Sequence, residues 1–157
     1  MESTDQRILA LLARDGRISY TEIGRRTGLS TSAAQQRVRR LEQRGVITGY
    51  HAELDPAALG RTLTAFISIR AINPEQDEAI PGVLESMPAI TSCFSVAGDA
   101  SFMCVAQVGT TSDLDVLLSQ LRSRANVSTV TTVVLTTIFS DRPLVEDPAA
   151  EEDLTDQ

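Results

Sequence analysis

The sequence of 157 residues predicts an α+β protein in two parts, a helical head followed by a region of mixed helices and strands. Within the first 50 residues, apolar residues recur with helical spacing and three helical segments end near Gly16, Gly28 and Gly45. From residue 64 onward, strand-like runs rich in Val, Ile and Thr alternate with two helical segments in the order β-α-β-β-α-β. Because this order is typical of the ferredoxin-like split β-α-β motif, we expect a ferredoxin-like domain behind the head.

The first two helices are expected to supply part of a small core. The first begins after Thr4 or Asp5, either of which can cap it, and ends at Asp15-Gly16. The second runs from about Thr21 to Thr27. The apolar residues expected to face the core are Ile8, Leu9, Leu11, Leu12, Ile23 and, in the following turn, Leu29.

The third helix is the most informative segment. Ser30 can cap its start and Gly45 can stop it. Its apolar stripe consists of Ala34, Val38 and Leu41. At about 100° per residue, the opposite side carries Ser32, Gln36, Arg39, Arg40 and Gln43. A helix that is apolar on one side and rich in Arg, Gln and Ser on the other suits a DNA groove, so the head is predicted to be a DNA-binding helix-turn-helix.

The charge distribution supports this interpretation. The whole chain has a formal charge of −7, but residues 1–50 contain nine Arg and five acids, a net +4, whereas residues 51–157 contain five Arg and sixteen acids, a net −11. A basic head on an acidic body concentrates attraction to phosphate at one end of the molecule.

In the body, the first strand is expected over residues 64–72, with Ala65, Ile67 and Ile69 on one face, and an acidic loop over 73–79 follows it. A short helix begins at Pro81 and packs through Leu84 and Met87. Strands over 90–97 and 102–108 flank a hairpin turn at 98–101, Thr111 or Ser112 caps the next helix, and a long strand covers 127–139. The inward face of that second helix consists of Leu114, Leu117, Leu118 and Leu121.

A sheet of this kind has helices on one face only, and Val, Ile and Thr would leave the other face exposed to water. Burial against a second copy is the simplest remedy, so we expect at least a homodimer with two recognition helices on one side.

Residues 49–55 are expected to form a strand or wing, and residues 56–60 a turn or a single helical turn. The domains predicted are 1–50 (DNA binding), 51–61 (linker), 62–142 (ligand sensing and oligomerisation) and 143–157, an acidic disordered tail with six acids and no base. We expect a cytoplasmic protein, because the sequence lacks a signal peptide and any apolar run of 18 residues.

The chain resembles the Lrp/AsnC (feast/famine) family of bacterial transcription regulators over about residues 4–142. The resemblance rests on residues 5–9 (DQRIL), 15–17 (DGR), 29–30 (LS) and 37–50 (RVRRLEQRGVITGY), together with the β-α-β-β-α-β order. It implies a winged-type helix-turn-helix domain and a C-terminal effector and oligomerisation domain. It also implies dimers that can associate into octamers and a response to amino acids.

The resemblance carries DNA contacts onto the third helix. Thr31 and Ser32 at its start can hold phosphate, Gln35 and Gln36 can bond adenine, and Arg39 or Arg40 can bond guanine. Two further pairs leave alternatives open. Arg37 and Arg44 either touch phosphate or pair with acids, and Arg25 and Arg26 are either phosphate contacts or plain surface.

The effector site implied by the resemblance maps to the turn formed by Gly98, Asp99, Ala100 and Ser101. The family pattern places an acid three residues after the glycine, where this chain has Ser101; its acid stands earlier, at Asp99. A free amino acid needs an acceptor for its ammonium group, and Asp99 can serve as one. The alternative is that Asp99 is only a turn-forming residue.

The remaining candidates are weaker. Cys93 and Cys104 are expected to be reduced core thiols or, alternatively, a redox switch; they lie opposite each other only if Gly98-Asp99 forms the two-residue loop. With His51 as the single histidine, no His-rich metal site can form, and no catalytic residue or cofactor is predicted. The rival functions are a siroheme-decarboxylase-like enzyme and a nucleoid-type architectural protein that binds DNA broadly.

Overall fold

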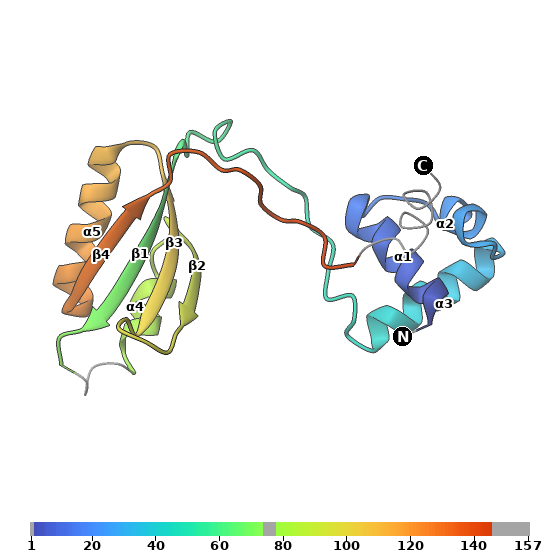
Figure 1. Ribbon diagram of the computed structural model, residues 1–157, viewed down its shortest axis with the longest axis horizontal. Coiled ribbons are helices and arrows are strands. Elements are labelled where there is room, and N and C mark those ends of the chain that lie inside the picture. Colours follow the sequence, from blue (N-terminus) through green and yellow to red (C-terminus); the bar gives the residue numbers. More distant parts are fainter. Residues whose placement is uncertain (1, 74–77, 146–157) are drawn as a thin grey trace, which may run out of the picture. The chain divides into compact units, whose positions relative to one another are not determined.

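The computed structural model describes residues 2–73 and 78–145 (Figure 1). The described residues fall into two compact units, one formed by residues 2–53 and 139–145 and the other by residues 54–138. We refer to them as the head and the body. The expected residue limits of linker and tail stay a prediction, and most of that tail, residues 146–157, lies outside the described residues.

The head consists of three helices, α1 (Ser3–Arg14), α2 (Tyr20–Thr27) and α3 (Thr31–Gln43). Their core confirms the predicted stripe of α3, because Ala34, Val38 and Leu41 are all buried. The buried cluster consists of Ile8, Leu9, Ile23, Ala34, Val38 and Leu41, with Leu12, Ile18, Leu29, Ile47 and Val145 packed at its margin.

The caps of α3 are those that the sequence predicts. The Ser30 hydroxyl accepts a hydrogen bond from the Ala33 amide at 3.2 Å, and Gly45 follows the helix with a φ of 67°. Gly28 takes the same left-handed conformation after α2, with a φ of 73°. These two positions need glycine because a Cβ atom is unfavourable there.

The predicted start of α1 is wrong. The helix begins at Ser3 with Glu2 at its N-cap and without a side-chain cap. Asp5 cannot cap it because its carboxylate is buried and accepts a hydrogen bond from Arg37. The strand expected as one alternative over residues 49–55 does not form, since these residues are neither helix nor strand. Residues 56–60 form the expected turn.

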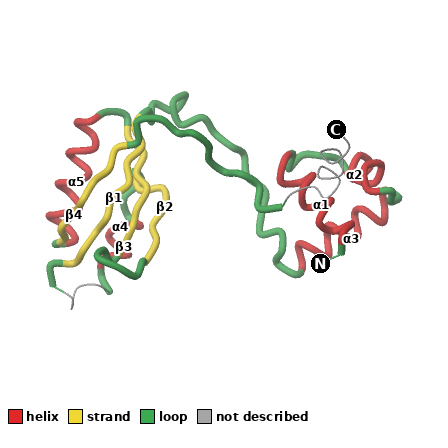
Figure 2. Tube along the Cα trace, in the orientation of Figure 1, coloured by secondary structure: helices red, strands yellow, loops and turns green. Residues whose placement is uncertain are grey.

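The body contains four strands and two helices among its described residues (Figure 2). They are β1 (Leu63–Ala71), α4 (Ile80–Glu85), β2 (Ile90–Ser95), β3 (Phe102–Val108), α5 (Thr111–Ala125) and β4 (Val127–Val133). The strands pair antiparallel in the order β2-β3-β1-β4. This topology confirms the predicted ferredoxin-like β-α-β-β-α-β domain.

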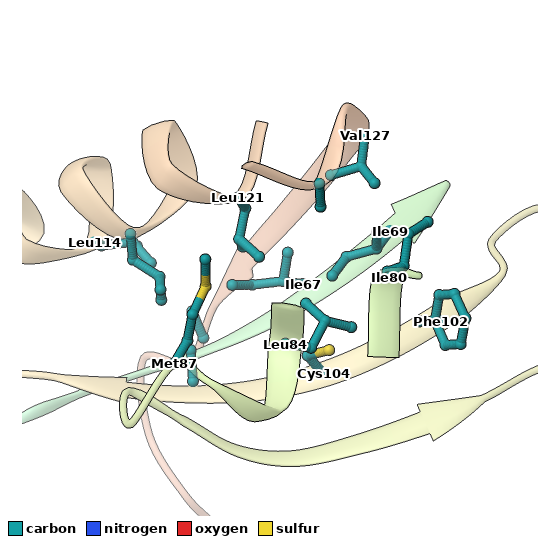
Figure 3. Packing of buried hydrophobic residues seen from close by; sticks show 14 of the residues in the cluster. Ile67, Ile69, Ile80, Leu84, Met87, Phe102, Cys104, Leu114, Leu121 and Val127 are labelled. Carbon is teal, nitrogen blue, oxygen red and sulfur yellow. The ribbon is translucent and has the colours of Figure 1, made fainter. Parts of the chain in front are cut away.

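Both helices cover one face of this sheet, and the core lies between them and the strands (Figure 3). The buried strand residues Ala65, Ile67 and Ile69 alternate along β1, as the period of two predicts. Leu84 and Leu121 pack onto them from the helices. On the opposite, uncovered face the large apolar residues Phe66, Phe94 and Val130 are 44%, 56% and 70% exposed.

Several element limits differ from the prediction: β1 begins and ends one residue early, at Leu63 and Ala71, and β2 ends at Ser95 instead of residue 97. The cap of α5 is Thr110 instead of Thr111 or Ser112, because Thr110 forms a capping box with Asp113. The helix α4 begins one residue early, at Ile80. The strand β4 ends at Val133 instead of residue 139. Its neighbour in the sheet, β1, begins at Leu63, so among the described residues the pairing runs out after one further bond, from the Val134 amide to the Thr64 carbonyl.

Candidate functional site

The exposed face of α3 is the first candidate site. Thr31, Ser32 and Gln36 are exposed along it, and so are Arg39 and Arg40. Gln35 is half-buried, at the edge of the face. The Ser32 hydroxyl lies 3.2 Å from that of Ser30, and the Thr31 hydroxyl lies 3.4 Å from that of Thr21. The start of α3 therefore presents a group of hydroxyls at the helix N-terminus.

Arg37 lies on a different side of α3 and is already paired. Its guanidinium donates to the Asp5 and Glu2 carboxylates, at 2.8 Å each. Both carboxylates raise the pKa of Arg37 above its ordinary value, Asp5 contributing most. Of the two alternatives left open by the sequence, pairing with acids is therefore the one observed for Arg37.

Arg25 and Arg26 on α2 share one acid. Arg25 donates to both oxygens of Glu22, at 2.8 and 2.7 Å, and Arg26 donates to one of them at 2.6 Å. Hydrogen bonds from Arg25 and Arg26 lower the pKa of Glu22 to about 2. The charge of the two arginines is thus partly neutralised within the head, and a phosphate contact by either one stays a prediction.

Arg39 and Arg40 have no such partner. Within residues 2–73 and 78–145, no carboxylate forms an ion pair with either guanidinium. Four acids of the head have other partners: Glu2 and Asp5 hold Arg37, Glu22 holds Arg25 and Arg26, and Glu42 accepts from Tyr50 at 2.9 Å. Arg39 and Arg40 therefore place two guanidinium groups without an ion-pair partner on the exposed face of α3, as phosphate and guanine recognition requires.

The second candidate site is the turn between β2 and β3. The Val96 amide donates to the Ser101 carbonyl at 3.0 Å and closes the turn around residues 97–100. The Arg70 Nε atom donates to the Asp99 backbone carbonyl at 2.6 Å, and its Nη2 atom lies 3.9 Å from the Asp99 carboxylate. A hollow of about 260 Å³ is lined by Ser68, Ile69, Arg70, Asp99, Ala100, Ser128 and Val130.

The structure thus brings together only part of the predicted turn site. Asp99 and Ala100 line the hollow, whereas Gly98 and Ser101 do not. Sequence reasoning missed Arg70, which supplies the cationic group of the hollow. A signal was present, because Arg70 is the one charged residue in a strand that is otherwise apolar or hydroxylic, and it lies near the end that meets the turn.

None of the described helices is long and apolar enough to cross a membrane. In the same residues, no group of three or more His, Cys, Asp or Glu side chains is arranged to hold a metal ion.

Comparison with known proteins agrees with both units. The winged helix-turn-helix DNA-binding family matches residues 1–48, and the Lrp/AsnC ligand binding domain matches residues 64–144. The chain is 42% identical over 142 residues to the HTH-type transcriptional regulator LrpA of Mycobacterium tuberculosis, which covers 90% of this chain and 95% of that protein.

Two solved structures have the same fold. A feast or famine regulatory protein from M. tuberculosis complexed with L-methionine superposes with a TM-score of 0.87 at 41% identity, covering 92% of this chain and 99% of that one. A transcriptional regulator from Neisseria meningitidis complexed with L-methionine gives 0.86 at 26% identity, covering 92% and 96%.

The named relatives are transcriptional regulators and not enzymes, which decides against the siroheme-decarboxylase alternative. The helix-turn-helix head with its basic α3 face and the ferredoxin-like body are both accounted for by one family. The chain belongs to the Lrp/AsnC family of DNA-binding transcriptional regulators.

Proposed function

We propose that this regulator recognises its operator through the exposed face of α3, inserted in the major groove of DNA. Arg39 and Arg40 bond guanine edges, and Gln35 and Gln36 bond adenine edges. Thr31 and Ser32 hold phosphate at the start of the helix. The observation that carries this assignment is the contrast within α3 between the paired Arg37 and the exposed, unpaired Arg39 and Arg40.

We propose further that the working unit is at least a homodimer formed through the uncovered face of the sheet. The apolar side chains on that face come from all four strands: Phe66, Phe94, Met103, Val105 and Val130. Val105 and Met103 are partly buried, and the other three are exposed to water in a single chain. Association of two such faces removes this apolar area from water and supplies two α3 helices for two operator half-sites.

The proposed effector is an amino acid bound in the hollow at the β2–β3 turn. Arg70 can donate to its carboxylate, and Asp99 can accept from its ammonium group. Ser68 and Ser128 add hydroxyl groups to the same hollow. The L-methionine complexes of two family members support an amino acid as the class of effector.

The test is binding of the full chain to labelled DNA from upstream of its own gene, followed by fluorescence anisotropy over a salt series with unrelated competitor DNA. If a dimer neutralises about six to eight phosphates, log K falls with log salt with a slope of about −5 to −7. We expect tight binding that persists with competitor. Binding without sequence preference would instead support an architectural role.

The decisive variant combines Arg39→Ala with Arg40→Ala. It is expected to abolish the preference for operator over competitor while the oligomer size is unchanged. The matched control is Arg122→Ala combined with Arg124→Ala, which removes the same charge from α5 in the body. If the α3 variant binds the operator as tightly as the parent chain does, the proposed recognition face is refuted.

A further inference from the structure

The two cysteines of the chain form a cross-strand pair. Cys93 on β2 and Cys104 on β3 lie directly opposite each other in the antiparallel register. This is the arrangement expected if the turn is centred on Gly98-Asp99, one of the two alternatives left open by the sequence. The two side chains therefore belong to directly opposed residues of one hairpin, and the neighbouring Cys93 side chain contributes to raising the pKa of Cys104.

The backbone geometry of this pair is compatible with a disulfide. The Val96 amide bonds the Ser101 carbonyl, and hydrogen-bonded pairs alternate with non-hydrogen-bonded pairs along an antiparallel ladder. The Cys93–Cys104 pair lies three residues along each strand from the hydrogen-bonded Val96–Ser101 pair, so it occupies a non-hydrogen-bonded position. The Cα atoms of such pairs are about 4.5 Å apart, which lies within the roughly 4.4–6.8 Å that disulfides span.

The environments of the two thiols differ. Cys104 is fully buried in the core of the body, among the side chains drawn in Figure 3. Burial, with a smaller contribution from the neighbouring Cys93 side chain, raises its pKa to about 12, so Cys104 stays a thiol near neutral pH. Cys93 is exposed on the edge strand, in a hollow of about 450 Å³ that also contacts Pro81, Glu85 and Phe102. A small oxidant can therefore reach Cys93 and not Cys104.

We propose that Cys93 and Cys104 are a reversible redox pair, oxidised by a peroxide to a disulfide that restrains the β2–β3 hairpin. The Cys93 thiolate attacks one peroxide oxygen, the O–O bond breaks, and the departing hydroxide takes a proton to become water. This leaves a sulfenic acid on Cys93. The Cys104 sulfur then attacks Cys93, its proton leaves with the hydroxyl as a second water, and the S–S bond forms. The two thiols lose two electrons in total to the peroxide.

The disulfide closes a loop that contains the whole turn from Val96 to Ser101. Oxidation therefore restrains the segment that carries Asp99. An effect of oxidation on effector binding rests on the proposed function, in which Asp99 contacts the effector. Formation of the bond itself does not depend on DNA or on an amino acid, so the two proposals can fail separately.

The test starts from the reduced full chain, which is treated with hydrogen peroxide, and remaining thiols are then blocked with N-ethylmaleimide. Trypsin leaves both cysteines in one peptide, because no Lys or Arg lies between Arg70 and Arg122. Chymotrypsin cleaves after Phe94 and Phe102 and separates them unless they are cross-linked. We expect a peptide pair joined through Cys93 and Cys104, lost on adding dithiothreitol, and severalfold slower amide exchange at residues 96–101 in the oxidised chain.

The control is Cys104→Ala, a small apolar replacement that leaves Cys93 in place. Its Cys93 should still react with peroxide, and no slowing of amide exchange should follow. Three results would overturn the proposal: a blocked Cys93 with no linked peptide in the parent chain, a Cys93–Cys93 link between two chains, or unchanged exchange at the turn in the oxidised parent.

Discussion

Arg37 donates to the buried carboxylate of Asp5 at 2.8 Å and so joins α3 to α1 inside the head. Asp5 is 7% exposed and is the only buried charged residue among the described residues. The arginines two and three positions further along α3, Arg39 and Arg40, face solvent. One short arginine-rich segment therefore performs two tasks, holding the head together and presenting positive charge to a partner.

The first prediction concerns this pair. Arg37→Met keeps most of the apolar stem but leaves the Asp5 carboxylate without its guanidinium donor. The free energy of unfolding should fall by about 1–3 kcal/mol, the usual cost of leaving a buried charged group unsatisfied. The measurement is urea unfolding followed by circular dichroism at fixed protein concentration. The matched variant Arg39→Met should change stability by less than about 0.5 kcal/mol. Equal effects of the two variants would contradict the structural role of Arg37.

The second prediction concerns the turn between α2 and α3. Gly24 is buried, and a Cβ atom on it would lie 2.6 Å from the Leu29 carbonyl oxygen. Gly24→Ala should therefore force the turn apart and lower the free energy of unfolding by about 1–3 kcal/mol. The control is Gly82→Ala in α4, where a Cβ atom meets nothing within 4 Å. This substitution should leave the free energy of unfolding unchanged or raise it by up to about 1 kcal/mol. Thermal unfolding of both variants tests the contrast, and a tolerated Gly24→Ala would refute it.

The third prediction concerns the cap of α5. The Thr110 hydroxyl accepts a hydrogen bond from the Asp113 amide, and the Asp113 carboxylate accepts from the Thr110 amide at 2.9 Å. Thr110→Ala should lower the free energy of unfolding by about 1 kcal/mol. Thr111→Ala, which changes the neighbouring threonine without touching the capping box, should have little effect. Denaturant unfolding of the two variants discriminates between them, and a larger effect at Thr111 would favour the cap expected from the sequence.

The fourth prediction is a pH dependence. Hydrogen bonds from Arg25 and Arg26 lower the pKa of Glu22 to about 2, below its ordinary value of 4.5. Because the folded pKa is the lower one, this interaction stabilises the head above pH 4.5 and is lost as the pH falls towards 2. An NMR titration should place the Glu22 midpoint near 2. Combining Arg25→Gln with Arg26→Gln should raise it towards 4.5. A normal Glu22 pKa in the parent chain would show that the ion pairs do not persist in solution.

The fifth prediction concerns the effector. Asp99→Ala and Arg70→Gln each remove one of the two charged groups of the hollow at the β2–β3 turn. Each should weaken the response of DNA binding to an amino acid by roughly tenfold or more, as expected for a lost charged hydrogen bond. DNA affinity without the amino acid should be unchanged. Arg122→Gln, on α5, is the charge-matched control. The measurement is anisotropy against amino acid concentration, and an unchanged response in both variants would place the site elsewhere.

The sequence predicts best what depends on neighbouring residues. The stripe of Ala34, Val38 and Leu41 and the caps at Ser30 and Gly45 follow from local spacing, and the structure confirms them. The order of strands and helices in the body follows for the same reason. The residue-level DNA and effector contacts stay predictions.

Errors occur where distant residues decide the outcome. Asp5 was expected to cap α1, but Arg37, 32 positions later, draws its carboxylate inward. The end of β4 is set by the start of β1, more than 60 residues earlier. Arg70 joins the turn site only because β1 lies beside β3 in the sheet, so no short window of sequence could show it.

The strand order β2-β3-β1-β4 also governs when each unit can fold during synthesis. The core of the head uses α1 to α3, which all leave the ribosome early and contact one another over short sequence separations. In the body, β1 gains its second neighbour only when residues 127–133 have been made, so its apolar strands wait for almost the whole chain. A ribosome stalled inside the body would therefore display the three packed helices of the head, with the basic face of α3, on a sheet that is still unfinished.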